Sequence, residues 1–229
     1  MDTPSLPLPV PTADGSLTLK SPGHGETFHS HHGALRESRH VFLEASGLAR
    51  RLASGEATRV LEVGFGTGLN VLVAADAALG QPGRLEVVSL ESDPLPAELL
   101  RSLGHGSLLA HPELAESLLQ GLEEQRGRIE LAPAVSFELR TGDARKLPLP
   151  DGMDVVFHDA FSPGTSPELW TPAFLARLFA SLRPGGVLTT YSAAGTVRRT
   201  LAGVGFGVER LPGPPGKHHM TRATRPRGA

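Results

Sequence analysis

Four acidic side chains accompany a glycine-rich turn in this sequence, and together they could bind a cationic, nucleoside-like ligand. The turn is Gly64-Phe65-Gly66-Thr67-Gly68. Glycines let backbone N–H groups approach a ligand closely, and a helix that begins there adds further N–H donors. The acids are Glu62, just before the turn, and Glu91, Asp143 and Asp159 further along the chain.

The spacing of the acids narrows the choice of ligand. Glu91 follows the glycines by about 20 residues, where a carboxylate can accept hydrogen bonds from both ribose hydroxyls. Asp143 could accept a hydrogen bond from an adenine amino group. Asp159 ends another predicted strand, at the same edge of the sheet, where the ligands of such folds bind. A phosphate-binding loop is excluded because no Gly-Lys-Ser/Thr is present, and Leu69 breaks the dinucleotide pattern. Each acid alone could be a helix cap, but together they suit S-adenosylmethionine, which is cationic and has no phosphate.

The elements that must position these residues alternate between strands and helices. The apolar run Val60–Val63 predicts a buried strand. The Ala-rich segment that ends near Leu79 predicts the helix after the turn. The other expected strands are 85–90, 136–140, 153–158, 187–192, 205–210 and 217–223, and the other expected helices are 34–52 with a break at 46–47, 96–103, 111–126, 167–182 and 194–204.

This alternation predicts the α/β class, with a doubly wound and mostly parallel sheet. We expect residues 1–33 to form an N-terminal arm with a small hairpin, 34–224 a Rossmann-like domain, and 225–229 a basic tail. Because Glu91, Asp143 and Asp159 end successive strands, they should meet at the carboxyl edge of the sheet, where ligands of such folds bind.

Composition excludes several kinds of protein. The chain has 229 residues, no cysteine and a net charge of −2, which argues against a non-specific nucleic-acid coat and against thiol chemistry. No run approaches the roughly 20 apolar residues of a membrane span, and we expect a cytoplasmic protein. His24, His29, His31 and His32 have no Cys or Asp at ligand spacing, so we expect no metal site.

Two short motifs resemble those of class I S-adenosylmethionine-dependent methyltransferases. Glu62–Gly68 is similar to their motif I, and Arg183–Gly186 is similar to the turn before their fifth strand. Longer stretches resemble the methyltransferase domain of the bifunctional enzymes that modify the tRNA wobble uridine, in a stand-alone form without the FAD-dependent oxidase half. These stretches are Phe65–Asn70, Asp159–Pro163, Pro167–Thr171, Ser192–Arg199 and Arg36–Leu43.

The resemblance implies a fold, a cofactor and a reaction. The fold would be a seven-stranded, mostly parallel Rossmann-like sheet with a short N-terminal extension. The reaction would move a methyl group from S-adenosylmethionine to the amine of 5-aminomethyl-2-thiouridine in a tRNA anticodon, giving 5-methylaminomethyl-2-thiouridine. A separate FAD-dependent oxidase, or the complex that forms the aminomethyl group, would supply the substrate.

Site residues follow from the pattern and the resemblance together. Asp159 matches the family's catalytic-loop acid; it could accept the amine proton, or only position the amine or the cofactor's ammonium group. The expected cofactor-binding residues are Glu62, Gly64, Phe65, Gly66, Thr67, Gly68, Asn70, Glu91, Asp143, Ala144 and Asp159.

Substrate-binding candidates each have a structural alternative. Phe161 and Trp170 could stack on an anticodon base, or Trp170 could be core. Tyr191 could line the pocket or pack on its strand, and Glu37 and Arg39 could cover the cofactor or lie on a solvated helix face. The basic candidates for a phosphate-facing patch, or a solvated face, are Arg198, Arg199, Lys217, Arg222, Arg225 and Arg227.

Two other functions stay open at this point. One is an enzyme that methylates a small-molecule amine, or an aminopropyltransferase like spermidine synthase, which shares the architecture. The other is a non-catalytic Rossmann-like module that binds RNA.

Overall fold

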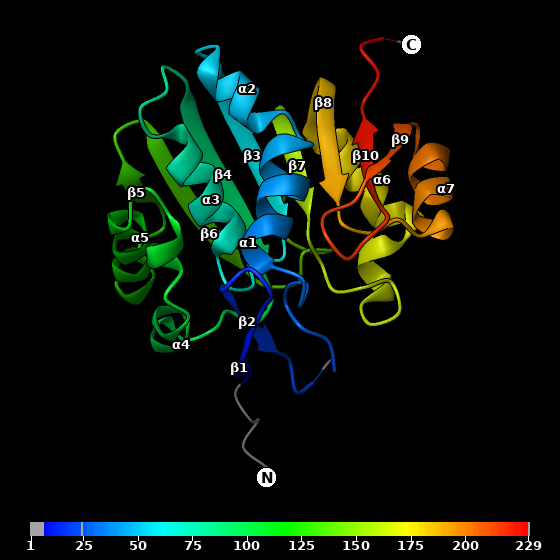
Figure 1. The fold of residues 1–229 in the computed structure, drawn as a ribbon. Coiled ribbons are helices and arrows are strands. Elements are labelled where there is room, and N and C mark those ends of the chain that lie inside the picture. The colour runs from blue at the N-terminus through cyan, green and yellow to red at the C-terminus, as the bar shows by residue number, and fades with distance from the viewer. Residues whose placement is uncertain (1–6, 24, 229) are drawn as a thin grey trace.

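A sheet of eight strands forms the centre of the protein, a computed structural model that describes residues 7–23 and 25–228. Its strands are β3 Ala57–Val63, β4 Arg84–Glu91, β5 Ile129–Ala132, β6 Val135–Thr141, β7 Met153–His158, β8 Leu182–Thr190, β9 Gly207–Pro212 and β10 His219–Thr224. Their order across the sheet is β5-β6-β4-β3-β7-β8-β10-β9 (Figure 1). The inner strands β6, β4, β3, β7 and β8 run parallel, and the other three pair antiparallel.

The predicted α/β class and mostly parallel sheet are confirmed, but the predicted number of seven strands is wrong for the described sheet. The additional strand is β5, which pairs antiparallel with β6 at the sheet's edge. Ala134, in the turn between them, has φ 62. With only four residues, Ile129–Ala132, β5 has too short a pattern to be distinguished from a loop by sequence.

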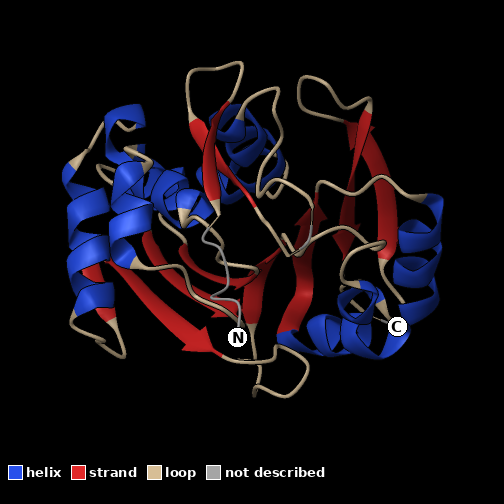
Figure 2. Cartoon of the chain, turned by 90° about the horizontal axis from the view of Figure 1, so that it is seen from below, coloured by secondary structure: helices blue, strands red, loops and turns tan. Residues whose placement is uncertain are grey.

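Helices cover both faces of the sheet. They are α1 Ala34–Glu37, the π-helix η1 Ser38–Glu44, α2 Leu48–Ala53, α3 Leu69–Ala78, α4 Ala97–Ser102, the 3₁₀ helix η2 His105–Leu108, α5 Glu113–Glu123, the 3₁₀ helix η3 Pro167–Trp170, α6 Pro172–Ser181 and α7 Gly195–Val204. In Figure 1, α1, α2 and α3 lie on the near face, and the view from below in Figure 2 shows helices on both sides of the strands. None of the described helices has the length and apolar character to cross a membrane.

Alternation along the strands divides the core into two clusters. Val60 packs with Phe42 and Leu69 in one cluster, whereas its neighbour Leu61 packs with Phe174 and Leu178 in the other. Successive side chains of a strand point to opposite faces, so a strand buried on both sides needs a continuous apolar run. The run Val60–Val63 meets this need, and this is why sequence alone could identify the strand.

Two predicted helices are interrupted. The predicted break at residues 46–47 is confirmed: Gly47 has φ 78 and precedes α2. The helix before it contains the unpredicted π-helix η1, in which Ala45 N donates to His40 O. The predicted helix 167–182 divides into η3 and α6 because Thr171 caps α6, accepting a hydrogen bond from Phe174 N at 3.3 Å.

The predicted turn Arg183–Gly186 is a bulge inside β8. Met153 pairs with Leu182 and Val155 with Val187, so β8 advances from 182 to 187 while β7 advances only from 153 to 155. The glycines at 185 and 186 accommodate this extra length.

The N-terminal arm contains an antiparallel hairpin of β1 Leu8–Pro11 and β2 Leu17–Lys20. Leu19 is fully buried, and its carbonyl accepts a hydrogen bond from Phe28 N at 2.9 Å. The hairpin lies at the lower end of the sheet in Figure 1, beyond the carboxyl ends of the parallel strands. The arm is therefore placed against the edge at which ligands of this fold bind.

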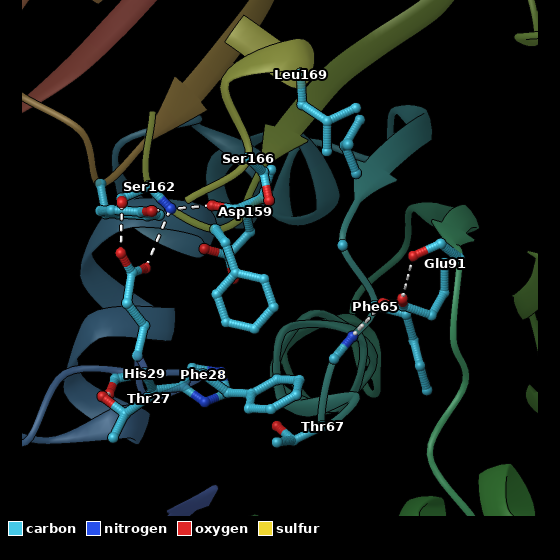
Figure 3. Close-up of a pocket in the computed structure, with 18 of the residues that line it drawn as sticks. Thr27, Phe28, His29, Phe65, Thr67, Glu91, Asp159, Ser162, Ser166 and Leu169 are labelled. Atoms are coloured by element: carbon cyan, nitrogen blue, oxygen red, sulfur yellow. Dashed lines mark hydrogen bonds between the residues drawn. The ribbon is translucent and has the colours of Figure 1, made fainter. Parts of the chain in front are cut away.

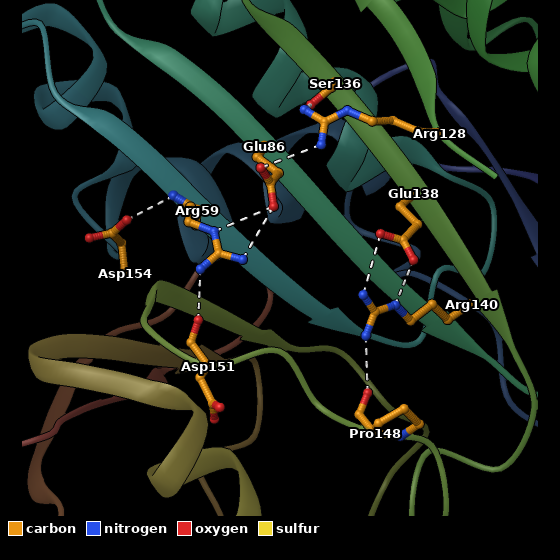
Figure 4. A network of polar contacts seen from close by, with 9 residues as sticks. All are labelled: Arg59, Glu86, Arg128, Ser136, Glu138, Arg140, Pro148, Asp151 and Asp154. Carbon is orange, nitrogen blue, oxygen red and sulfur yellow. Dashed lines mark hydrogen bonds and ion pairs between the residues drawn. The ribbon is translucent and has the colours of Figure 1, made fainter.

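Ion pairs connect neighbouring strands in the half of the sheet nearest their amino ends (Figure 4). Arg59 of β3 reaches Glu86 of β4 at 3.3 Å, and its Nη1 donates to the carbonyl of Asp151 at 2.7 Å. Arg128 reaches the other oxygen of Glu86 at 3.6 Å. These side chains are substantially exposed, so each pair should contribute little to stability.

Asp154 is the exception, because its side chain is only 4% exposed. One carboxylate oxygen accepts a hydrogen bond from Arg59 N at 2.8 Å, and the other lies 2.5 Å from Arg183 Nε and 3.5 Å from Arg51 Nη1. It thus joins β3, β7, β8 and α2 at one point.

Replacing Asp154 by Asn should lower the free energy of unfolding by about 2 kcal/mol. The change removes the buried counter-charge of Arg51 and Arg183, although the half-exposed Glu56 still faces these two groups at 2.6 and 3.8 Å. Denaturant unfolding measures this change. The control Glu130→Gln removes a carboxylate that is 66% exposed and should change stability by less than about 0.5 kcal/mol. Equal effects of the two variants would contradict the role given to Asp154.

Candidate active site

A cavity of about 1100 Å³ opens at the carboxyl edge of the sheet. Its wall combines the glycine turn after β3, the ends of β4, β6, β7 and β8, and residues 25–32 of the arm. Figure 3 shows Glu91, Phe65 and Thr67 on one side of this space and Asp159, Ser162 and the arm residue Phe28 facing them. The acids predicted to converge at this edge, Glu91, Asp143 and Asp159, all line the cavity.

The glycine turn is shaped by backbone angles and by close contact with β7. Gly64, Gly66 and Gly68 have φ of 91, 52 and 75 respectively, in the region that disfavours side chains. A methyl group built on Gly64 would lie 2.6 Å from the carbonyl oxygen of Asp159. Only glycine therefore lets the turn pass directly beneath the Asp159 loop.

Glu91 connects this turn to the loop after β4. Its Oε2 accepts a hydrogen bond from Gly66 N at 3.1 Å, and its Oε1 accepts one from Asp93 N at 3.0 Å. Ser92 Oγ also donates to Oε1, at 3.4 Å. A carboxylate has about four acceptor positions, so these three hydrogen bonds leave capacity for a ligand on the cavity side. The backbone contacts fix its orientation.

Asp143 forms an ion pair with Arg145 that was not predicted from the sequence. Arg145 holds it with two hydrogen bonds, Nε to Oδ1 at 2.8 Å and Nη2 to Oδ2 at 2.7 Å. These bonds lower the pKa of Asp143 to about 2. Asp143 is thus an ionised acceptor at all ordinary pH values, with Ala144 buried beside it.

Glu62 lies beneath the cavity and does not line it. It is fully buried in β3, and its Oε2 accepts a hydrogen bond from Ser89 Oγ of β4. Burial raises the pKa of Glu62 to about 8, although hydrogen bonds from Ser89 and Asn70 oppose this shift. Gly68 and Asn70 likewise lie behind the wall that Gly64–Thr67 form.

The raised pKa of Glu62 predicts a pH-dependent stability. The folded state holds this proton more tightly than the unfolded chain, whose pKa is 4.5. The contribution of the protonated Glu62 carboxyl to the free energy of unfolding is therefore fully present below pH 4.5. It is lost as pH rises to about 8. Denaturant unfolding across this range should show that wild type loses roughly 2–4 kcal/mol relative to Glu62→Gln. Parallel curves for the two proteins would contradict the shift.

Asp159 is held in place by a short relay of hydrogen bonds. Asn70 Nδ2 of α3 donates to Asp159 Oδ2 at 2.8 Å, and Ser38 Oγ donates to Asn70 Oδ1 at 2.6 Å. Ser38 belongs to the π-helix η1. This irregular helix therefore orients the Asn70 amide, and the amide in turn orients the Asp159 carboxyl group. Burial and then the neighbouring charge of Glu37 raise the pKa of Asp159, although Asn70 opposes the shift. A carboxyl with a raised pKa is a stronger base once ionised.

The wall beyond Asp159 contains an ion pair on an aromatic ring. Lys217 Nζ lies 2.6 Å from Glu37 Oε2 and 4.2 Å from the centre of the Tyr191 ring. Tyr191 OH donates to the carbonyl of Ala160 at 2.9 Å, and burial raises the pKa of this phenol. Glu37, Tyr191 and Lys217, three of the expected substrate-binding residues, therefore do meet at the cavity.

The arm contributes contacts to the site that no pattern in the sequence had indicated. Glu26 accepts hydrogen bonds from Ser162 N at 3.2 Å and from the hydroxyls of Ser162 and Thr165, so it binds the loop after Asp159. Phe28 packs edge-on against Phe161, with ring centres 5.2 Å apart. Nothing local in the sequence marks Glu26 and Phe28, because their contacts join positions 133 to 139 residues apart.

Trp170 takes the core alternative rather than the stacking one. It is 6% exposed, packs 4.3 Å from the ring of His158, and its Nε1 donates to the carbonyl of Phe161 at 2.9 Å. It supports the Asp159 loop from behind. Arg39 is exposed and lies outside the cavity wall, so it takes the solvated-face alternative.

The basic residues expected to form one patch are dispersed. Lys217 lies in the cavity, Arg222 pairs with Glu209 at 2.7 Å, and Arg225 donates to backbone carbonyls including that of Ala180 at 3.0 Å. Arg227 is exposed in the C-terminal segment. Arg198 and Arg199 border a separate small pocket.

Of the histidines expected to hold no metal, His29, His31 and His32 line the cavity. His24 lies outside the described residues. His29 is buried, with Nδ1 3.3 Å from Thr18 Oγ1, and burial lowers its pKa to about 4. No group of three or more metal-ligating side chains occurs within residues 7–23 and 25–228.

The residues at the wall fit S-adenosylmethionine chemically. Thr67 Oγ1 is buried at the cavity and has no hydrogen-bond partner within the described part of the chain, so it is available to a ligand. A methyl group on Gly66 would lie 3.0 Å from Phe28 Cδ1, so the turn and the arm enclose a narrow passage. Glu26, Glu37, Glu91 and Asp159 make the wall acidic, which suits a cationic sulfonium.

A family model described as S-adenosyl-L-methionine-dependent methyltransferase matches residues 110–226, just over half of the chain. The chain belongs to this methyltransferase family. The enzyme class and the methyl donor expected from the sequence are thereby confirmed, and the fold of the methyltransferase agrees with them.

Relatives of this methyltransferase agree with the resemblance seen in its sequence. It is 38% identical over 226 residues to the tRNA 5-methylaminomethyl-2-thiouridine biosynthesis bifunctional protein MnmC of Aromatoleum aromaticum, covering 92% of this chain and 34% of that protein. It is 42% identical over 215 residues to the protein of the same name from Pseudomonas paraeruginosa, covering 87% and 32% respectively. The chain thus spans about a third of the length of these curated relatives.

A solved structure is similar over nearly the whole methyltransferase. The crystal structure of MNMC2 from Aquifex aeolicus superposes with a TM-score of 0.80 at 32% identity, covering 98% of this chain and 72% of that one. The resemblance to the methyltransferase part of the wobble-uridine enzymes is therefore confirmed.

Proposed function

We propose that this methyltransferase transfers a methyl group from S-adenosylmethionine to the exocyclic amine of 5-aminomethyl-2-thiouridine at the tRNA wobble position, giving 5-methylaminomethyl-2-thiouridine. The observation that carries the proposal is the position of Asp159. It is a half-buried carboxylate in an acidic cavity, held by Asn70, where an amine can be bound and deprotonated. The names of the similar MnmC proteins supply the nucleoside.

The reaction requires the protein to align the amine with the methyl group and to provide a proton acceptor. When bound, S-adenosylmethionine supplies the methyl group, whose bond to sulfur breaks with its electron pair going to the sulfur. The amine nitrogen must carry a free lone pair to form the new bond, so Asp159 accepts its proton in this proposal. The fixed distance between Asn70 and Asp159 keeps the acceptor oxygen in a constant place during this transfer.

The glycine-turn side of the cavity would hold the methyl donor. Glu91 would accept hydrogen bonds from the ribose hydroxyls, and Thr67 Oγ1 gives a further polar contact. Asp143 and Ala144 would lie beside the adenine, with Arg145 keeping Asp143 ionised. Glu62, Gly68 and Asn70 would act from behind the wall, shaping the site without touching the ligand.

The opposite side would hold the nucleoside. Phe161, braced by Phe28, would present a ring to the unstacked base, and Tyr191 and Lys217 would border its far side. The partner is then a tRNA anticodon stem-loop, and the reaction would take place in the cytoplasm. A separate FAD-dependent oxidase or the aminomethyl-forming complex would supply the amine.

Labelled S-adenosylmethionine and tRNA from cells that lack this modification provide the test. We expect label in 5-methylaminomethyl-2-thiouridine after digestion to nucleosides, and none with tRNA that is already fully modified. Transfer to putrescine or spermidine, with none to the tRNA, would replace the proposal by a small-molecule amine methyltransferase. Cofactor and tRNA binding without any transfer would indicate a non-catalytic module.

A further inference from the structure

Three arginines gather at the outer end of the sheet, away from the cavity. Arg198 and Arg199 lie in α7 and Arg210 in β9, and together with Gly195 they border a pocket of about 290 Å³. A methyl group built on Gly195 would lie 3.2 Å from Arg199 Nη1 and 4.0 Å from Arg198 Nη2. The two guanidinium groups of α7 therefore converge above the first residue of their helix.

These arginines have no counter-charge within the described part of the chain. Ion pairs bind Arg222 to the neighbouring Glu209, but no ion pair or hydrogen bond of residues 7–23 and 25–228 involves the guanidinium groups of Arg199 or Arg210. Arg198 Nε is buried without a hydrogen-bond partner among these residues. Because like charges repel, an anion that binds between these guanidinium groups would stabilise their arrangement.

The pKa of a histidine beside the cluster reflects the same positive charge. The pKa of His219 is lowered, first by burial and then by Arg210, His218 and Arg198. The three arginines thus give this surface its positive character.

Strand register places the cluster on the same edge as the active site. Thr221 of β10 pairs with Arg210 on one side and with Thr190 of β8 on the other. Neighbouring strands are about 4.8 Å apart, so Arg210 lies about 10 Å across the sheet from Thr190. Tyr191, which follows Thr190, lines the cavity. Figure 1 shows α7 and β9 together at this end of the sheet.

We infer that Arg198, Arg199 and Arg210 bind backbone phosphates of the RNA whose base enters the cavity. This inference rests on the proposed function. Guanidinium groups match phosphate oxygens with paired N–H donors, and about 10 Å along the sheet edge is a short distance for a nucleotide chain that leaves the cavity. The arginine cluster would hold the RNA backbone beside the base that enters the cavity. It would not distinguish one RNA sequence from another.

Charge reversal tests the cluster without disturbing the fold. The variant is Arg199→Glu with Arg210→Glu, since both residues are exposed. The control is Arg50→Glu with Arg84→Glu, two exposed arginines in α2 and at the start of β4, on the opposite edge of the sheet. Both variants change the net charge equally. Binding of unmodified tRNA is measured at several salt concentrations, and S-adenosylmethionine binding is measured beside it.

We expect the cluster variant to bind tRNA at least about tenfold more weakly than the control, with a salt dependence shallower by about 1.4 in log–log slope for two lost phosphate contacts. Its affinity for S-adenosylmethionine should equal that of wild type. Equal tRNA binding by the two variants, or no tRNA binding by wild type, would overturn the inference. Selective loss of binding by the cluster variant, in a protein that never methylates this tRNA, would support the cluster and refute the proposed reaction instead.

Discussion

Replacing Asp159 by Asn is expected to reduce methyl transfer to tRNA by about 10²–10⁴-fold, the usual contribution of a general base. Affinity for S-adenosylmethionine should stay within a few-fold of wild type. The amide keeps the size of the side chain, but it cannot accept the proton of the amine. Single-turnover transfer with saturating cofactor measures the first effect, and calorimetric titration measures the second.

The pH profile separates the two roles considered for Asp159. Burial raises the pKa of this carboxyl, so its active, ionised form appears at higher pH than for an ordinary aspartate. The rate should therefore rise with pH through that pKa in wild type, and the Asn variant should lack this rise. Asp151→Asn, at an exposed position, serves as the matched control. Joint loss of transfer and cofactor binding would assign Asp159 to the cofactor alone.

Replacing Gly64 by Ala is the second change for which we expect a large effect. The new methyl group would lie 2.6 Å from the backbone carbonyl of Asp159, at φ 91. A backbone atom cannot move aside as a flexible side chain could, so the turn and the end of β7 must separate. We expect cofactor affinity to fall about 100-fold or more, because a displacement near 1 Å can have that effect at such a site.

Gly80→Ala provides the control for this change. Gly80 also has positive φ, 75, but a methyl group there would meet no atom within 4 Å. It should lose only the roughly 1 kcal/mol that a strained backbone costs and should bind the cofactor normally. If Gly64→Ala bound the cofactor as tightly as Gly80→Ala does, the role given to the contact with Asp159 would be contradicted.

Local patterns in the sequence were reliable where one element carries the signal. The run Val60–Val63 identified a strand buried on both faces, and the glycines after it identified the turn. Glu91, Asp143 and Asp159 were correctly placed on one edge, because the parallel order of the strands follows from their alternation with helices. Each of these inferences needs only the period of the pattern and the position at which it ends.

Features that depend on distant contacts were not predictable. From the sequence, Trp170 could either stack on a base or be buried in the core. The fold places it against His158, in the core. Arg145 could not be assigned to Asp143, nor Glu26 to Ser162, because a charged residue in a loop has many possible partners. The π-helix η1 was missed because its sequence has ordinary helical periodicity.

The methyl donor of this methyltransferase could be predicted from the glycine turn, the acids and the motifs in its sequence, and the same patterns predicted Asp159 as a site residue. Which side chains meet depends on the packing of the whole fold. That packing closed the cavity with the arm, oriented Asp159 through Asn70 and Ser38, and dispersed the basic patch so that Arg198 and Arg199 were joined by Arg210. Periodicity is a property of one segment, whereas these contacts depend on how segments far apart in the chain pack together.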